Sequence, residues 1–284
     1  MKKQIWVCVL LVFAMLLSLS ATAFAATDDD RTVYHATNWN DMVDILSELE
    51  DGEKVKIEVD GYTITDIVYI GEKTAYISAN NVDILFQQRN FWKDSTPRLK
   101  GTMFHIDGDD VTINFNWSDL ESYYGSAVEV DGDNCTILNA FFRRCKNPEG
   151  DGAGIHITDN DPGCVIINCE FRECEAENGG GIFIDSNDAS IENCRFLSCK
   201  CTEKGKGYDI YDNEHESVAI DCKTTSSDKE AFINLESVTD CQFGWDGRGS
   251  FVSEGNLWII ITVAVVVIGV SALLILKKKK KAAI

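Results

Sequence analysis

The sequence predicts an all-β protein, a single-stranded parallel β-helix (solenoid) with an N-terminal amphipathic capping helix and one C-terminal transmembrane helix. Glycine-led blocks recur every 26 or 27 residues, short apolar runs alternate with polar residues, and helical periodicity in the central region is confined to one N-terminal segment. The chain has 284 residues, 45% of them hydrophobic, so an intrinsically disordered protein is excluded.

Two interleaved series of short blocks carry the repeat. The first series occupies residues 125–130, 152–157, 179–184 and 205–210, at steps of 27, 27 and 26 residues. The second occupies residues 166–171, 191–196 and 238–243, with a weaker copy at 137–142. A unit of this length is too short for a propeller blade and lacks the leucine spacing of leucine-rich repeats, but it fits one β-helix coil. About 190 residues then form on the order of seven coils, stacked about 4.8 Å apart.

Equivalent side chains of successive coils are expected to stack in columns. Asn139, Asn168 and Asn193 form one column at a bend, where amides can hydrogen-bond from coil to coil. A second, aromatic column inside the solenoid contains Phe142, Phe171 and Phe196.

Cysteines also recur at equivalent positions, in the sets Cys169/Cys194 and Cys145/Cys174/Cys199. Ten of the eleven cysteines lie in the region predicted to be exported, where an even number normally indicates disulfides. Neighbouring coils are close enough for such bonds. Cysteine is also a small hydrophobe that fills a narrow interior, so a ladder of buried thiols is the alternative, and both remain open.

The capping helix is predicted from apolar residues at helical spacing before the first strand-like run. Trp39, Met42, Val43, Leu46 and Leu49 share one helix face. Thr37 or Asn38 can cap its start, and Gly52 follows its end. Because an open first coil exposes unpaired edges, we expect this helix to cover it.

The two chain ends predict a membrane-anchored surface protein. Residues 1–25 have the basic start, apolar middle and Ala-Phe-Ala exit of a signal peptide, and 257–276 form an uncharged stretch long enough to span a bilayer. The five lysines after it place the tail 277–284 in the cytoplasm. The remaining predicted boundaries are the cap at 26–54, the β-helix ectodomain at 55–246 and a juxtamembrane linker at 247–256.

Charge excludes one class of partner. The formal net charge is −20, and the predicted ectodomain, without the seven terminal lysines, carries 46 acidic and 19 basic residues, a net −27. Such a surface attracts cations and repels anionic polymers, so we expect no nucleic-acid partner.

Residues 171–182, Phe-Arg-Glu-Cys-Glu-Ala-Glu-Asn-Gly-Gly-Gly-Ile, resemble the repeat of polymorphic outer membrane proteins, in which Phe-x-x-Asn is followed closely by Gly-Gly-Ala-Ile. More widely, residues 55–246, and most clearly 125–243, are similar to right-handed parallel β-helix proteins of the pectate-lyase-like superfamily. Cys174 stands where the repeat has Asn, Gly181 where it has Ala, and a single helix replaces the family's outer-membrane anchor. The resemblance implies a right-handed solenoid displayed at a cell surface, often adhesive, without indicating a ligand.

Acidic residues recur after the strand-like runs and are the candidates for chemistry. Turn chemistry alone explains Asp at tight bends, whereas stacked carboxylates can also bind Ca²⁺, the one cofactor this column suggests. A carboxylate pair acting on a sugar polymer, assisted by an arginine, is the weaker catalytic interpretation, with candidates Asp131, Asp159 and Arg144. The Ca²⁺ candidates are Asp107, Asp131, Asp133, Asp159, Asp161, Asp185 and Asp188.

Two functional hypotheses follow. The first is a non-enzymatic adhesin or glycan-binding module that recognises a glycan or a ligand on a host or neighbouring cell, with His156, Phe183 and Tyr211 in an outward aromatic strip. The second is a surface-anchored polysaccharide lyase or glycoside hydrolase. Because the polygalacturonase signature of Asn-x-Asp, paired Asp and Gly-His-Gly is not visible, the sequence favours the first hypothesis.

Overall fold

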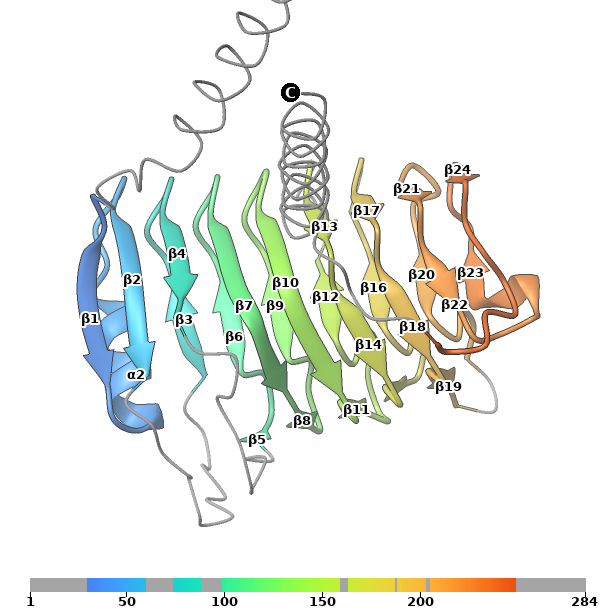
Figure 1. The fold of residues 1–284 in the computed structure, drawn as a ribbon, viewed down its shortest axis with the longest axis horizontal. Coiled ribbons are helices and arrows are strands. Elements are labelled where there is room, and N and C mark those ends of the chain that lie inside the picture. The colour runs from blue at the N-terminus through green and yellow to red at the C-terminus, as the bar shows by residue number, and fades with distance from the viewer. Residues whose placement is uncertain are drawn as a thin grey trace, which may run out of the picture.

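The computed structural model describes residues 30–59, 74–87, 99–158, 163–186, 188–202 and 205–248. Within these residues the chain winds into a parallel β-helix whose three sheets run along its length (Figure 1). The predicted signal peptide at 1–25 and transmembrane helix at 257–276 lie outside them. Among the described residues, no helix has the length and apolar character needed to cross a membrane.

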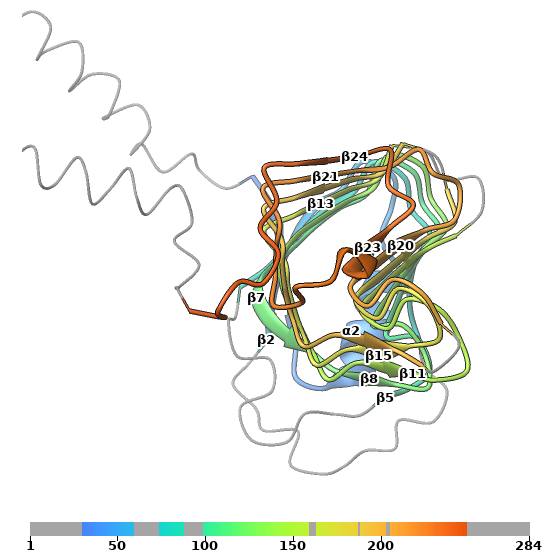
Figure 2. The same cartoon turned by 90° about the vertical axis from the view of Figure 1, so that its right-hand side faces the viewer.

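Successive coils contribute strands to three shared sheets, which superpose when viewed along the axis (Figure 2). Sheet A contains β1 (Thr32–Ala36), β2 (Lys54–Val59), β4 (Asp83–Phe86), β7 (Thr112–Leu120), β10 (Thr136–Arg143), β13 (Val165–Ile167), β14 (Glu170–Arg172), β17 (Ser190–Glu192), β18 (Arg195–Leu197), β21 (Val218–Ile220), β22 (Lys223–Thr224) and β24 (Ser237–Thr239). Sheet B contains β5 (Leu99–Lys100), β8 (Ser122–Tyr123), β11 (Lys146–Asn147), β15 (Glu175–Ala176) and β19 (Lys200–Cys201). Sheet C contains β3 (Ala75–Ile77), β6 (Phe104–Ile106), β9 (Val128–Val130), β12 (Ile155–Ile157), β16 (Ile182–Ile184), β20 (Ile210–Asp212) and β23 (Phe232–Ile233).

All strand pairs are parallel and join neighbouring coils, as the repeat predicted. Ile155 lies directly opposite Ile182, and Phe142 opposite Phe171. The seven strands of sheet C are separated by six steps, so the described residues form about six turns, close to the seven expected.

The fourth glycine block was aligned incorrectly by two residues. Ile182 pairs with Ile210, so Gly179 corresponds to Gly207 and the step is 28 residues rather than 26. Both glycines have positive φ, and a Cβ at Gly179 would lie 2.2 Å from the carbonyl oxygen of Ile182. The residue equivalent to Gly179 is therefore the glycine that shares its left-handed backbone, Gly207, and not Gly205, the first glycine of the fourth block.

The shifted alignment changes the position of Asp212. It pairs with Ile184 and is buried inside the solenoid. Its carboxylate accepts hydrogen bonds from the backbone N–H groups of Glu214 and Ser217.

The predicted asparagine column exists and has a backbone cause. Asn139, Asn168 and Asn193 all adopt left-handed φ values between 48° and 56°, which Asn tolerates better than most residues. The Asn193 amide donates to Asn168 Oδ1 at 2.6 Å. Asp221 and Asp240 occupy the same bend in the next two coils, with φ values of 53° and 55°.

Aromatic rings fill the interior and one end of the solenoid. The ring centroids of Phe171 lie 4.6 Å from Phe142 and 4.9 Å from Phe196, with interplanar angles of 7°, which confirms the predicted column. At the C-terminal end, Phe232 meets Phe196 edge-on and also contacts Phe243, so this end of the core is closed by aromatic packing.

All ten cysteines within the described residues are free thiols, and eight of them are buried. Cys174 donates to the carbonyl oxygen of Phe142, one coil earlier, and Cys199 donates in the same way to Phe171. Burial raises the pKa of the Cys174 and Cys199 thiols, which keeps them protonated at neutral pH. The structure thus corresponds to the thiol-ladder alternative.

The N-terminal helix α2 (Trp39–Ser47) covers the first coil, as expected (Figure 1). Asn38 caps its start by accepting the N–H of Asp41 at 3.1 Å. Trp39, Met42 and Leu46 are buried, and the Trp39 ring packs edge-on against Phe104 at 5.4 Å.

One interior carboxyl group has an unusual environment. Asp209 is only 1% exposed and accepts a hydrogen bond from the Thr224 hydroxyl. Loss of solvation by burial raises the pKa of Asp209 to about 7, although hydrogen bonds from Thr224 and Cys199 favour its charged form.

We expect Phe171→Ala to lower the free energy of unfolding by about 3–5 kcal/mol, because it leaves a cavity between two stacked rings. The matched control is Phe141→Ala, at a half-buried position of β10, the strand that pairs with the strand of Phe171. It should lower the free energy of unfolding by about 1 kcal/mol or less. Urea denaturation followed by circular dichroism measures both. Equal losses for the two variants would contradict the stacked core.

We expect alkylation of the native protein to label at most Cys201 and Cys241, the two half-exposed thiols. Denaturation without reductant should then expose all ten thiols that follow residue 25, counted by mass spectrometry. Fewer labels, together with the loss of two hydrogens from the protein mass for each missing pair of thiols, would instead support disulfides between coils.

We expect Asp209→Asn to become progressively more stable relative to the wild type as the pH rises from about 4 to about 7. Over this range the folded protein retains a proton that the unfolded chain releases, so wild-type stability falls, by about 4 kcal/mol in total, and the difference is constant above pH 7. Thermal melts across this range measure the effect, with Asp240→Asn at an exposed turn as the matched substitution. A pH-independent difference would show that Asp209 ionises normally in the folded protein.

Candidate functional site

The outward face of sheet C carries aromatic and titratable side chains along one line. In these three-residue strands the first and third side chains are mostly buried and the central one points outward. We call the central residues the sheet C strip: Tyr76, His105, Glu129, His156, Phe183 and Tyr211.

The C-terminal half of the sheet C strip is aromatic. The Phe183 and Tyr211 rings stack with centroids 5.6 Å apart and an interplanar angle of 11°, and His156 meets Phe183 edge-on at 5.1 Å. Phe183 is 7% exposed, whereas His156 and Tyr211 on either side are half-buried. The three side chains share one line, as the sequence predicted, but Phe183 is buried and exposes little surface.

A second line of polar side chains, which we call the polar column, follows directly after the strands of sheet C. Three levels of this column carry acids and three carry hydrogen-bond donors, and each donor binds a carboxylate on a neighbouring level. Ser78 donates to Asp107 Oδ2 at 3.1 Å, and Thr158 donates to Asp131 Oδ1 at 2.6 Å. The column comprises Ser78, Asp107, Asp131, Thr158, Asp185 and Asn213.

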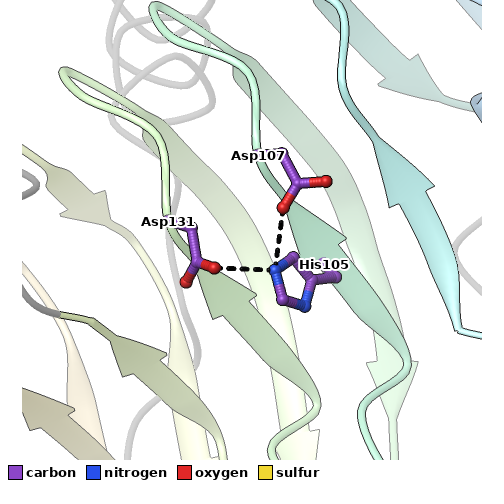
Figure 3. Close-up of side chains that lie close together, drawn as sticks. All are labelled: His105, Asp107 and Asp131. Atoms are coloured by element: carbon purple, nitrogen blue, oxygen red, sulfur yellow. Dashed lines mark hydrogen bonds and ion pairs between the residues drawn. The ribbon is translucent and has the colours of Figure 1, made fainter.

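The two lines meet at His105. His105 Nε2 lies 2.9 Å from Asp107 Oδ1 and 2.9 Å from Asp131 Oδ2, so two carboxylates from neighbouring coils converge on one imidazole nitrogen (Figure 3). The other ring nitrogen, Nδ1, lies 3.8 Å from Glu129 Oε2. The Tyr76 ring lies beside the imidazole, with centroids 5.1 Å apart.

Of the predicted Ca²⁺ candidates, the structure brings Asp107 and Asp131 together and places Asp185 two levels further along the same column. Asp185 accepts a hydrogen bond from the Asn213 amide at 2.7 Å. Asp159 and Asp161 lie outside the described residues, and Thr158 occupies the column at their coil.

Asp133 and Asp188 belong to a different bend, where turn chemistry explains them. Asp133 donates its backbone N–H to Asp109 Oδ1 at 3.0 Å, and Asp109 donates its own to Asn80 Oδ1 at 2.9 Å. Asp188 has φ of 61° at a bend where Asn134, two coils earlier, has 56°. Expecting these two acids in one carboxylate column with Asp131 was therefore wrong.

Arg144, the third catalytic candidate, lies at another corner of the coil. It follows β10, adopts a left-handed φ of 54° and forms an ion pair with the buried Glu121 at 2.9 Å. Asp131 instead follows β9 and contacts His105 and Thr158. The structure thus does not bring Arg144 and Asp131 into one site.

A family model described as "Right handed beta helix region" matches residues 61–244. This match covers more than half of the chain, which therefore belongs to the right-handed β-helix family, as the resemblance implied. No curated protein and no solved structure is significantly similar to it.

His105 is the residue of the site that the sequence did not reveal. Its β6 strand, Phe-His-Ile, has the same apolar–polar–apolar pattern as the Ile-His-Ile of β12, but residues 101–106 lack the clear glycine block that made the later coils recognisable. If His105 had been aligned with Glu129 of the following coil, the sequence would have placed it between Asp107 and Asp131.

Proposed function

We propose that this protein is a membrane-anchored carbohydrate-binding module that presents the sheet C strip to glycans at the cell surface. The anchor in this proposal is the predicted helix at 257–276, and export depends on the predicted signal peptide at 1–25. The ligand lies across neighbouring coils, along the axis of the solenoid.

The observation that supports this proposal best is the row of contacting rings of His156, Phe183 and Tyr211, of which His156 and Tyr211 are partly exposed. Rings that face outward on a rigid sheet lose little conformational entropy when a ligand packs on them, and their faces suit the C–H-rich faces of sugars. Tyr76, 47% exposed, adds a further ring at the other end of the strip. Because the rings belong to successive coils, a chain-like ligand can contact more than one of them.

The charge of the protein limits the class of glycan. The net charge of −20 disfavours anionic polysaccharides, and Glu129 stands within the strip itself. We therefore propose neutral or amino-sugar glycans as ligands, bound without chemical conversion.

We expect Tyr211→Ala to weaken glycan binding about tenfold, or about 1.4 kcal/mol, because it removes one face of the aromatic surface. A glycan array with the full chain in detergent micelles identifies a ligand, and titration calorimetry with that ligand measures the affinity. Tyr124→Ala, an exposed tyrosine next to sheet B, is the matched control and should bind as the wild type does.

Two outcomes would contradict the proposal. Equal affinity of the Tyr211→Ala variant and the wild type would exclude the aromatic strip as the binding surface. Release of unsaturated products or new reducing ends from a bound polysaccharide would show an enzyme, the alternative suggested by the fold family.

A further inference from the structure

The His105 cluster has a donor arrangement that a hydrogen-bonded histidine alone does not require. Three potential ligand atoms, His105 Nε2, Asp107 Oδ1 and Asp131 Oδ2, all lie within 4.8 Å of one another, on two adjacent coils. One imidazole N–H points along a single direction, yet both carboxylate oxygens lie 2.9 Å from the same nitrogen. A small cation between the three atoms satisfies all of them at once.

The surrounding groups orient these atoms in the way that outer-shell partners orient metal ligands. The second oxygen of each carboxylate accepts a hydroxyl hydrogen bond, from Ser78 for Asp107 and from Thr158 for Asp131. Each carboxylate is thereby held with its free oxygen turned toward His105 (Figure 3).

The opposite side of the imidazole is oriented too. Glu129 Oε2 faces His105 Nδ1 at 3.8 Å and itself accepts a hydrogen bond from the Thr102 hydroxyl at 2.8 Å. An acid beside the non-ligating nitrogen favours the tautomer that leaves Nε2 free to bind a metal. Three carboxylates around one imidazole also concentrate negative charge, which a divalent cation neutralises.

We propose that His105, Asp107 and Asp131 bind one divalent transition-metal ion, of which Zn²⁺ is the best fit. Ca²⁺ and Mg²⁺ prefer oxygen ligands throughout, whereas imidazole nitrogen with two carboxylates suits Zn²⁺ and its neighbours. Zn²⁺ distances of about 2.0–2.2 Å place tetrahedral donors about 3.4 Å apart, so the two carboxylates need to move outward by about half an ångström. Water completes the coordination on the solvent side.

This site goes beyond the proposed glycan binding and does not depend on it. It lies at the Tyr76 end of the sheet C strip, whereas the stacked rings begin at His156, two coils after His105. It also changes the metal expected from the sequence, because an acidic column alone indicated Ca²⁺.

Titration of the full chain in detergent micelles with ZnCl₂ tests the proposal, and Co²⁺ serves as a spectroscopic substitute. We expect one ion per chain and visible Co²⁺ bands of nitrogen and oxygen coordination, without the near-ultraviolet charge-transfer band that thiolate ligands produce. His105→Ala and Asp131→Asn should each weaken binding at least tenfold, and a hundredfold excess of Ca²⁺ should not displace the ion.

Matched controls separate this site from other acids and histidines. Asp185→Asn removes a carboxylate from the same polar column, and His35→Ala removes an imidazole beside Glu58 on sheet A, so both should bind Zn²⁺ as the wild type does. Circular dichroism of each variant confirms that it is folded, and Asp131→Asn, which keeps the side-chain shape, provides the test if His105→Ala does not fold. Absence of one-to-one binding, unchanged affinity of both site variants, or thiolate bands in the Co²⁺ spectrum would overturn the proposal.

Discussion

The structure depends on one constraint, the in-register parallel hydrogen bonding between successive coils. Each strand pairs only with the equivalent strands one coil before and one coil after it, so residues 19–29 positions apart become neighbours. A slip of one residue would turn every inward side chain of a strand outward. The apolar first and third positions of the sheet C strands oppose such a slip, because they are buried at nearly every level.

The same constraint determines what can occupy the interior and the bends. Stacked coils leave little room, so identical small or flat side chains recur: thiols that donate to the carbonyl of the preceding coil, and phenylalanine rings that lie parallel. Several bends in each coil require a residue with left-handed backbone, which explains the recurrence of Asn, Asp and Gly. Much of the acidic character of the turns is therefore structural, whereas Asp107 and Asp131 converge with His105 into a group of three potential metal ligands.

The sequence predicted the architecture well where the repeat was regular. Phe142, Phe171 and Phe196, the asparagine column and the capping residues Trp39, Met42 and Leu46 all lie where the pattern placed them. It failed where coil length changed. The step from Ile182 to Ile210 is 28 residues, one more than each of the two steps before it. A copy of the second block at residues 219–224, with Thr224 in place of Phe, was also not recognised.

The site was predicted only in part for a related reason. An aromatic strip needs only alternation within a strand, and His156, Phe183 and Tyr211 were found in this way. A cluster across coils needs the register between levels, which one residue of error destroys, so Asp133 and Asp188 were grouped with Asp131 and His105 was missed. A site formed by side chains from different coils can therefore be predicted from the sequence only where the register between those coils is known.

The most direct test of this account is a crystal structure that resolves the register at residues 104–107 and 128–131. The account predicts Phe104 opposite Val128, with Cα atoms of paired residues about 4.8 Å apart along the axis and His105 between the carboxylates of Asp107 and Asp131. A register shifted by even one residue between these two strands would separate the three side chains. That result would contradict both the stacking and the site built upon it.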